Sequence, residues 1–575
     1  MMNYYQGQQR DATAQEYRAA YALVSHFALR ADSDGAPSNF KEAAAAGVPW
    51  HPTATSKEME NHKGNKSWTD LTLSELPSGR RLHKFVWVFK MKRDGTAKAR
   101  LCVQGCTMVD GVDYDQVFSA ALRYGSARCL FAFAARKGCW VRSIDFVAAY
   151  LQGEFLNGEV VYCHMPPGFE RLGPDGKPMI VRVDKPIYGI PQAGQRLQRK
   201  VFPWLRDLGL SQLDDSDGCV WVHADSPKGE VFALGVYVDN LQIVHSVPFG
   251  SDGEPVDQSS FCAKFIKKLR EDWDVVDEGP MIDMLGMQVR HNADGSFTLH
   301  QEKYIDKLID RFKPQPNKLA SRDNLPYSPN LLKVVEEALH LPAAGGPPFP
   351  ELIKPMQQRC GALMYSCGSC RPDIAYPTHL LARCMSRPTP AILRECDFVF
   401  NYLRATRDIG ITYAPLPDDT LTAMGDASWE VKNSTSGWCL SWQRAAISFG
   451  SRKQHCISLS STEAEMVALS EAAKDVIYFR KFLRKLEPSA VPGPTPLFTD
   501  NTGARDLSYN PEHHDKTKHI ARRHFYIRDM VEELEIVVPF VPTKSNIADF
   551  FTKCLDLATF RRFRAAIMNL PDEAP

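Results

Sequence analysis

Two aspartates lie where apolar runs end, in a pattern that could serve phosphoryl transfer. Asp145 ends the run that starts at residue 139, and Asp239 separates two apolar runs within Tyr237-Val238-Asp239-Asn240. Because an Asp-Asn pair tolerates a tight turn, the second pattern predicts a hairpin with Asp239 at its tip. Most aspartates at such tips are turn residues and nothing more. If both carboxylates converge, they could hold two divalent cations about 3.5–4 Å apart, one activating a hydroxyl and one stabilising a leaving group.

A second set of acids follows in the last third of the chain. Asp426 ends a strand-like run that starts at residue 421, and Glu465 lies near the start of an amphipathic helical pattern over about 462–486. Asp500 ends a short apolar run, and Asp549 follows a strand-like segment over about 537–542. The four acids therefore stand in turn on a strand, a helix, a strand and a helix. Magnesium prefers oxygen ligands and keeps some of its waters, so a few such carboxylates suffice to bind it.

Two glutamates near the start of the long helix have different predicted roles. Glu465 continues the apolar stripe of the helix, whereas Glu463 points to the solvent side. Both also fit a capping box, either Ser460 with Glu463 or Thr462 with Glu465. An acid on a core-facing stripe is costly unless it meets a cation or hydrogen-bond donors. We therefore assign Glu463 to the cap and Glu465 to a metal.

Elements rich in positive charge accompany these acids. The run Phe-Val-Trp-Val-Phe at 85–89, the turn at 93–95 and a second strand from about 99 predict a basic hairpin that contains Lys98 and Arg100. A second basic stretch, over 516–528, contains several histidines, which leaves a zinc site open as an alternative. Runs of this kind are often only solvated faces. Their positions beside the acids favour a phosphate-bearing partner.

The composition is that of an ordinary globular protein. The chain has 575 residues, of which 44% are hydrophobic and 24% charged, with a net charge of +1. No apolar run approaches the roughly 18 residues that a membrane span needs, and the first residues lack a secretion signal. We therefore expect an intracellular protein with no membrane association. Cys367 and Cys370 form a lone C-x-x-C, and we interpret the 15 cysteines as reduced structural thiols.

The first half of the chain resembles the reverse transcriptase of copia-type LTR retrotransposons. The matching segments are 87–90, 98–101, 113–119, 143–145, 188–193 and 237–239. The resemblance implies that Asp145 and Asp239 are metal ligands of the palm. It further implies substrate-binding roles for several residues: Lys98 and Arg100 near the triphosphate, Tyr150 against a ribose 2′-hydroxyl, Gln192 near template and incoming nucleotide, and Tyr237.

One position departs seriously from this pattern. The family's hairpin ends in Tyr-x-Asp-Asp, whereas this chain has Asn240 in the last place. An amide can still offer a carbonyl oxygen to a metal, but one negative charge is missing. We expect weaker binding of Mg²⁺, partial rescue by Mn²⁺, and a polymerase that is impaired rather than absent. Pro191 and Gly194 also depart from the pattern, in ways that we regard as tolerable.

The last part of the chain resembles the ribonuclease H of the same retrotransposons. All four acids of that family stand intact, at Asp426, Glu465, Asp500 and Asp549. The resemblance implies hydrolysis of the RNA strand of an RNA–DNA hybrid by a metal-activated water. It also includes 518–520 and 523–525, which we interpret as structural or hybrid-contacting segments. Further matches between 285 and 403 imply a thumb and a connection.

Together these features predict an α+β protein, a right-hand polymerase with fingers, palm and thumb followed by a connection and a ribonuclease H-like α/β domain. The expected boundaries are 1–37 for a poorly ordered lead-in, 38–246 for fingers and palm, 247–340 for the thumb, 341–415 for a linker and helical connection, 416–563 for ribonuclease H and 564–575 for a tail. No capsid, protease or integrase motif is present, which favours a piece of a polyprotein.

The resulting functional hypothesis is an RNA-directed DNA polymerase with ribonuclease H activity. The cofactors would be two Mg²⁺ or Mn²⁺ ions per site, bound by the carboxylates together with Asn240. The partners would be an RNA template, a DNA primer, an RNA–DNA hybrid and deoxynucleoside triphosphates, in a cytoplasmic particle or the nucleus. Two alternatives stay open: a non-catalytic nucleic-acid-binding relic, which Asn240 favours, and a chain active only as ribonuclease H.

Overall fold

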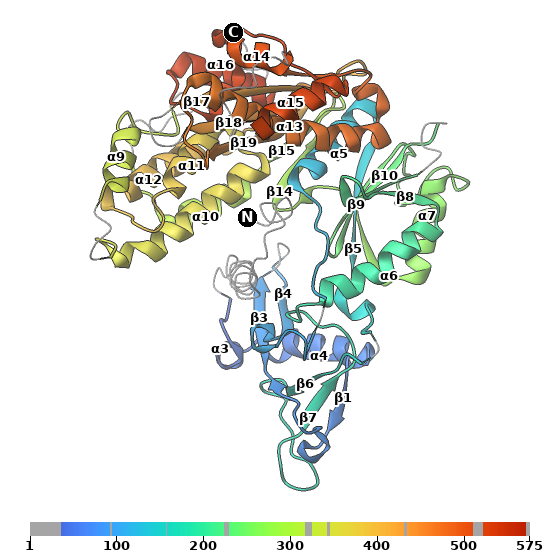
Figure 1. The fold of residues 1–575 in the computed structure, drawn as a ribbon. Helices are drawn as coiled ribbons and strands as arrows, with labels where there is room; N and C mark the ends of the chain where they lie inside the picture. Colours follow the sequence, from blue (N-terminus) through green and yellow to red (C-terminus); the bar gives the residue numbers. More distant parts are fainter. Residues whose placement is uncertain are drawn as a thin grey trace.

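The computed structural model describes residues 36–91, 95–114, 116–156, 158–223, 229–316, 325–341, 346–429, 434–509 and 521–570, with the side chains of 521–525 left out. The expected α+β architecture is confirmed. Figure 1 shows a fingers region at one end, a palm sheet above it, and a C-terminal domain at the other end, with a layer of helices beside it. Among the described helices, none combines the length and the apolar character needed to cross a membrane.

The fingers region contains the predicted basic hairpin. β3 (Phe85–Met91) pairs with β4 (Ala97–Val103), and the aromatic side chains at 85, 87 and 89 alternate into a core. This core also receives a four-stranded sheet in the order β1-β7-β6-β2. The remaining elements are α3 (Phe40–Ala46), α4 (Thr55–Gly64), β1 (Trp68–Leu71), β2 (Leu82–His83), β6 (Val161–His164) and β7 (Ile180–Val183).

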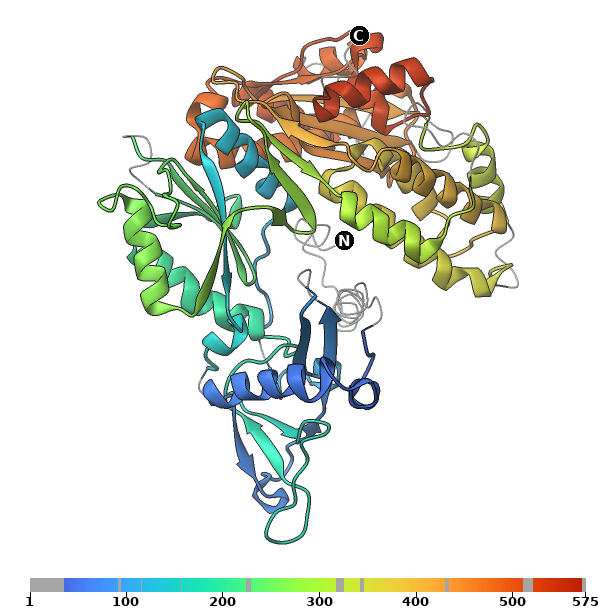
Figure 2. The ribbon, with the colours of Figure 1, turned by 180° about the vertical axis from the view of Figure 1, so that it is seen from behind.

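The palm is a six-stranded sheet in the order β12-β5-β11-β10-β9-β8. Its strands are β5 (Trp140–Phe146), β8 (Leu210–Leu213), β9 (Asp217–His223), β10 (Phe232–Tyr237), β11 (Asn240–His245) and β12 (Val275–Pro280). Helix α5 (Tyr124–Lys137) packs on one face, and α6 (Ala193–Asp207) and α7 (Phe261–Asp272) pack on the other. Two apolar layers thus hold the central strands in place, and Figure 2 shows the sheet between its helices from behind.

The expected end of the palm at residue 246 is too early. Strand β12 pairs with β5 in the palm sheet, and α7 contributes Cys262, Phe265, Ile266 and Leu269 to the palm core. The segment from 247 to 280 thus adds a strand and a helix to the palm sheet and its core. Its strand was missed because a run such as Val-Val-Asp-Glu-Gly-Pro has too few apolar residues to predict one.

A helical layer connects the palm to the C-terminal domain. β13 (Asp283–Met284), β14 (Met287–His291) and β15 (Phe297–His300) form a sheet that β16 (Gly410–Tyr413) completes. The helices are α8 (Glu302–Phe312), α9 (Leu331–Leu339), α10 (Ile353–Cys370), α11 (Ala375–Ala382) and α12 (Pro390–Ala405). Cys367 and Cys370 lie on α10 as free thiols, in agreement with the structural interpretation.

The C-terminal domain has a five-stranded sheet in the order β19-β18-β17-β20-β21. β17 (Thr422–Ser428), β18 (Thr435–Trp442) and β19 (Ala445–Lys453) are antiparallel, and β20 (Thr495–Phe498) and β21 (Ile536–Val537) continue the sheet in parallel with β17. The helices are α13 (Ser461–Leu486), α14 (Thr502–Tyr509), α15 (Ala521–Glu532) and α16 (Leu557–Met568). The expected domain end at 563 is also too early, because Ile567 and Met568 are buried.

The palm and the C-terminal domain pack directly on each other. Arg128 of α5 is buried, and it donates from Nε to the carbonyl oxygen of Ile447 on β19 at 3.0 Å. Its Nη1 donates to the carbonyl oxygen of Gly368 on α10 at 2.7 Å. Tyr478 of α13 is 2.7 Å from the hydroxyl of Ser126 on α5. One guanidinium thus joins three parts of the chain, which fixes the two predicted acidic sites relative to each other.

Candidate active sites

The structure brings Asp145 and Asp239 to the same end of the palm sheet. β5 and β11 are adjacent, and Asn240 is the register partner of Asp145. Asp239 lies in the tight turn between β10 and β11, and its carbonyl oxygen accepts from the amide of Phe146 at 2.7 Å. Val238 in this turn has a φ of 53°, which is strained for a β-branched residue. Strain of this kind at the tip of the hairpin is typical of a functional site.

Asp145 sits in a field that opposes its ionisation. Burial, then the carboxylates of Asp239 and Glu278, raise the pKa of Asp145 to about 7. Two cations partly offset this effect, since Lys98 and Arg100 of β4 lower the same pKa. A buried carboxylate among other carboxylates binds a divalent cation well, because the cation removes the repulsion that raises the pKa.

Cationic and phenolic groups surround Asp239. Arg100 lies with Nη2 3.8 Å from Oδ2 of Asp239, and its guanidinium stacks over the ring of Tyr188 at 4.4 Å. The hydroxyl of Tyr188 donates to the same Oδ2 at 3.4 Å. Tyr150 is packed against Tyr188, with ring centroids 4.5 Å apart. These four residues come from four segments of the chain and form one polar cluster, and three of them (Arg100, Tyr150 and Asp239) are predicted site residues.

Two other predicted substrate-binding residues have different surroundings. Gln192 is fully buried, and its Nε2 donates to the carbonyl oxygen of Asp113 at 3.2 Å. In this structure Gln192 joins the segment at 188–193 to the segment around Asp113, and its predicted place near template and incoming nucleotide stays a prediction. Tyr237 ends β10 beside the turn, half-buried, and burial followed by the charge of Asp239 raises its pKa.

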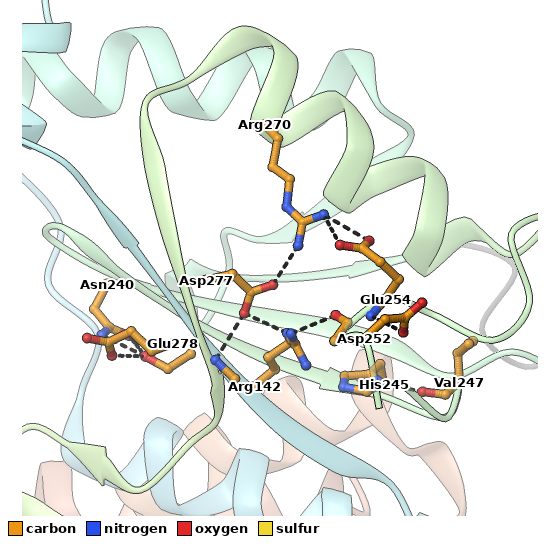
Figure 3. Close-up of polar contacts among 12 residues, drawn as sticks. Arg142, Asn240, His245, Val247, Asp252, Glu254, Arg270, Asp277 and Glu278 are labelled. Carbon is orange, nitrogen blue, oxygen red and sulfur yellow. Dashed lines mark hydrogen bonds and ion pairs between the residues drawn. The ribbon is translucent and has the colours of Figure 1, made fainter. Parts of the chain in front are cut away.

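Asn240 is hydrogen-bonded to Ser143 on the neighbouring strand and is linked through it to Glu278. Its Nδ2 donates to the hydroxyl oxygen of Ser143 at 3.0 Å, and that hydroxyl donates to Oε2 of Glu278 at 2.9 Å. Figure 3 shows Asn240 and Glu278 turned toward each other at the end of the sheet. Sequence reasoning missed Glu278, and the only signal for it is an acid within a short acidic run at 277–278.

The acids of the C-terminal site lie closer together than those of the palm site. The structure brings Asp426, Glu465 and Asp500 together so that one carboxylate oxygen of each lies within 4.8 Å of the others. Asp426 stands in β17, Glu465 in the second turn of α13, and Asp500 directly after β20. α13 packs across β17 and β18, which places Glu465 over the middle of the sheet.

Asp549, the fourth predicted acid, is linked to this cluster through the ammonium group of Lys553. Asp549 lies on the 3-10 helix at Ile547–Phe551, and its Oδ1 is 2.6 Å from Nζ of Lys553. The same Nζ is 3.8 Å from Oδ2 of Asp426. Thr552 donates its hydroxyl proton to Asp426 as well. Sequence reasoning did not single out Thr552 or Lys553, although both belong to the segment quoted around Asp549.

The electrostatics of this site favour a divalent cation. Burial, then Asp426 and Asp500, raise the pKa of Glu465 to about 9. Burial, then Asp549, raise the pKa of Asp426 to about 7. Oε2 of Glu465 is buried and, among the described residues, has no hydrogen-bond partner. An all-oxygen cluster with an unsatisfied buried oxygen fits a hard ion such as Mg²⁺.

The two glutamates of α13 have the different surroundings that the helical period predicts, one at the helix cap and one on the buried face. Ser460 is the N-cap residue, and its hydroxyl accepts from the amide of Glu463 at 3.2 Å. The carboxylate of Glu463 accepts from the amide of Leu459 at 2.6 Å, so it caps the helix. Glu465 is buried at 6% exposure and joins the acidic cluster. Residues 516–520 of the predicted basic stretch at 516–528 lie outside the described residues, as do the side chains of 521–525.

Comparisons with known proteins agree with the resemblance to a retrotransposon polyprotein that contains a reverse transcriptase. Residues 65–320 match the family described as "Reverse transcriptase (RNA-dependent DNA polymerase)". The chain is 31% identical over 558 residues to the retrovirus-related Pol polyprotein from transposon TNT 1-94 of Nicotiana tabacum, which covers 93% of this chain and 38% of that protein. It is 28% identical to the corresponding polyprotein from transposon RE1 of Arabidopsis thaliana, over 89% of this chain and 33% of that protein.

The chain thus spans little more than a third of the length of the curated relatives that it matches. A solved structure of a foamy viral protease–reverse transcriptase in complex with double-stranded DNA aligns with 86% of this chain and 70% of its own, at 12% identity and a TM-score of 0.46.

Proposed function

We propose that this chain, which is similar to the Pol polyproteins of plant transposons, is an RNA-directed DNA polymerase with ribonuclease H activity of the copia type. The observation that carries the proposal is the cluster of Asp426, Glu465 and Asp500, whose carboxylate oxygens lie within 4.8 Å of one another. Both sites would work by two-metal phosphoryl transfer. The substrates would be an RNA template, a DNA primer, deoxynucleoside triphosphates and an RNA–DNA hybrid, inside the cell.

At the C-terminal site the protein would position the scissile phosphate next to the bound ions. Asp426 would hold an ion together with Glu465 and Asp500, because one carboxylate oxygen of each lies within 4.8 Å of the others, and it also accepts from Thr552. When bound, Mg²⁺ would supply an activated water and stabilise the charge on the phosphate. Lys553 neutralises part of the acidic cluster before the ions arrive, and it could then pair with a phosphate oxygen of the hybrid.

At the palm site Asp145 and Asp239 would hold the ions. When bound, these would activate the primer 3′-hydroxyl and stabilise the leaving pyrophosphate. Arg100 is paired with Asp239 at 3.8 Å, and an incoming triphosphate would offer it a stronger partner. Tyr150, held against Tyr188, would contact the sugar edge of the nucleotide. On these grounds we place the fingers and palm at 38–280 and the ribonuclease H domain from about 416 to 568.

The decisive test uses a labelled RNA–DNA hybrid and a primed RNA template with the full chain. We expect cleavage of the RNA strand in Mg²⁺, and its loss in Asp426→Asn. We expect primer extension that is stronger in Mn²⁺ than in Mg²⁺, and its loss in Asp239→Asn. Glu471→Gln on α13, outside both sites, is the matched control. A chain that cleaves no hybrid and extends no primer in either ion contradicts the proposal.

A second candidate function is ribonuclease H alone. Asn240 favours it, because the palm then has one carboxylate fewer at the hairpin than the related sequences imply. Hybrid cleavage without primer extension in Mg²⁺ or Mn²⁺ would support it. Absence of both activities, with nucleic-acid binding retained, would support the non-catalytic relic instead.

A further inference from the structure

Asn240 and Glu278 are joined by a single hydroxyl group, and the two lie on strands that flank β5. β11 carries Asn240, β5 carries Ser143, and β12 carries Glu278. Register pairs Asn240 with Asp145, so the amide, Ser143 and Asp145 share one face of the sheet. We propose that Glu278 is the third carboxylate of the palm site, supplying through Ser143 the negative charge that Asn240 lacks. The inference rests on the proposed polymerase function.

The direction of Glu278 is set by an irregularity in the edge strand. β12 pairs with β5 through Asp277 opposite Ile144 and Gly279 opposite Ser143, with a bulge between them. Glu278 is the extra residue. Gly279 has a φ of 81°, a backbone conformation that suits glycine. Bulges re-aim side chains and are frequent beside active sites. Here the bulge sends Glu278 to the face of Ser143 and Asp145.

The two adjacent acids of β12, Asp277 and Glu278, therefore have different partners. Asp277 accepts from Nε of Arg142 at 2.7 Å and pairs with Nη2 of Arg270 at 3.1 Å, so its charge is neutralised. Figure 3 shows Asp277 turned toward both arginines and Glu278 turned away from them, toward Asn240. Within the described part of the chain, no lysine or arginine lies within ion-pair distance of Glu278. Its charge remains available to the site.

The hydroxyl of Ser143 has one proton, and this proton decides how Asn240 is oriented. Oγ of Ser143 lies 2.9 Å from Oε2 of Glu278 and 3.5 Å from Oδ1 of Asn240, so its proton goes to the nearer acceptor, which is also the charged one. The oxygen of Ser143 then accepts from Nδ2 of Asn240 at 3.0 Å, which leaves Oδ1 with only a distant donor and with lone pairs to offer to an ion. Glu278 thus orients a neutral ligand and adds a full negative charge close to Asp145.

Restoring a carboxylate with Asn240→Asp should not simply strengthen metal binding. In Asn240→Asp, two carboxylates compete for the single proton of Ser143, and their charges repel across β5. If Glu278 is first changed to Gln, an aspartate at 240 becomes the only acceptor. The effects of Asn240→Asp and Glu278→Gln should therefore be strongly non-additive.

The test measures Mn²⁺ binding to the full chain by the paramagnetic signal of the free ion, in a background of Asp426→Asn that disables the C-terminal site. We expect Glu278→Gln to weaken binding at the palm about tenfold, as loss of a group that orients a ligand does. Asn240→Asp should restore that loss about tenfold in the Glu278→Gln background, and change affinity less than threefold alone. Glu271→Gln, an exposed acid on α7, is the matched control and should leave affinity unchanged. Circular dichroism and the melting midpoint report whether each variant is folded.

Unchanged Mn²⁺ affinity in folded Glu278→Gln overturns the proposal, and so do additive effects of the two substitutions. Primer extension measured on the same proteins separates the inference from the proposed function. Extension by the parent chain that is insensitive to Glu278→Gln rejects the inference and keeps the polymerase. The expected binding pattern without extension by any variant keeps the inference and rejects the polymerase.

Discussion

Metal binding at the C-terminal site should release protons, and the number released should depend on pH. Glu465 is buried and its pKa is raised to about 9, and the pKa of Asp426 is raised to about 7. A divalent ion binds the ionised carboxylates and not the protonated ones. Because both pKa values are raised, the protonated forms dominate at low pH, and the affinity for metal must rise as the pH rises through each value.

The size of the effect follows from those values. Because pH 7 lies about two units below the pKa of Glu465, ionising this carboxyl at pH 7 costs about 3 kcal/mol, or about a hundredfold in affinity. Ionisation of Asp426 adds about tenfold in affinity between pH 6 and pH 8. We therefore expect the apparent Kd for Mn²⁺ to fall by roughly three orders of magnitude between pH 6 and pH 8. About two protons should be released per ion at pH 6, and about one at pH 8.

The assay is calorimetric titration of Mn²⁺ into the full chain carrying Asp145→Asn, which disables the palm site, in buffers of different ionisation enthalpy. Glu465→Gln should bind more weakly but release about one proton fewer at each pH. Glu471→Gln, on the same helix and outside the cluster, should release as many protons as the parent. Release of less than half a proton at pH 7, or equal release from Glu465→Gln and the parent, would refute the reasoning.

Three further predictions concern stability and are measured by thermal or denaturant unfolding. Without metal at pH 8, Asp426→Asn should stabilise the chain by roughly 1–3 kcal/mol, because a carboxyl with a raised folded-state pKa loses stability as the pH rises from about 4 through 7; no gain in EDTA would contradict this. Arg371→Met should cost about 3–5 kcal/mol, because it strands the fully buried carboxylate of Asp373, and the double change Arg371→Met with Asp373→Leu should recover most of it. Gly105→Ala should destabilise the fingers by about 1–3 kcal/mol or more, because its new Cβ would lie 2.0 Å from the carbonyl oxygen of Gly189; an unchanged midpoint would show that the backbone shifts freely.

Local patterns in the sequence predicted the features that local physics controls. The hairpin tip at Asp239 follows from a turn-forming pair between two apolar runs. The separation of Glu463 from Glu465 follows from the helical period, which places one at the cap and the other on the buried stripe. In both cases the decisive neighbours lie within a few residues along the chain, so no knowledge of the tertiary structure was required.

Features that depend on distant segments could not be predicted in the same way. Glu278 meets Ser143 at 2.9 Å across 135 residues of sequence, and a bulge rather than a periodic pattern sets its direction. Gln192 matches the related sequences, yet its side chain is fully buried against Asp113. Strand β12, which extends the palm sheet beyond residue 246, could not be predicted because it lies at the edge and carries few apolar residues. Edge strands need less apolar character than central ones.

The register of the palm sheet limits how the charge missing at Asn240 can be replaced. A substitute must lie on the face of Asp145, within reach of the hairpin, which restricts it to the strands that flank β5. On β11 the next residue of that face is Gln242, which is neutral and buried against α5. On β12 the register partners are Val276 and Gly279, which carry no charge either. Only the bulged residue between Asp277 and Gly279 offers a carboxylate there. The bulge in β12, which presents Glu278, therefore compensates for the charge that is missing at Asn240 in β11.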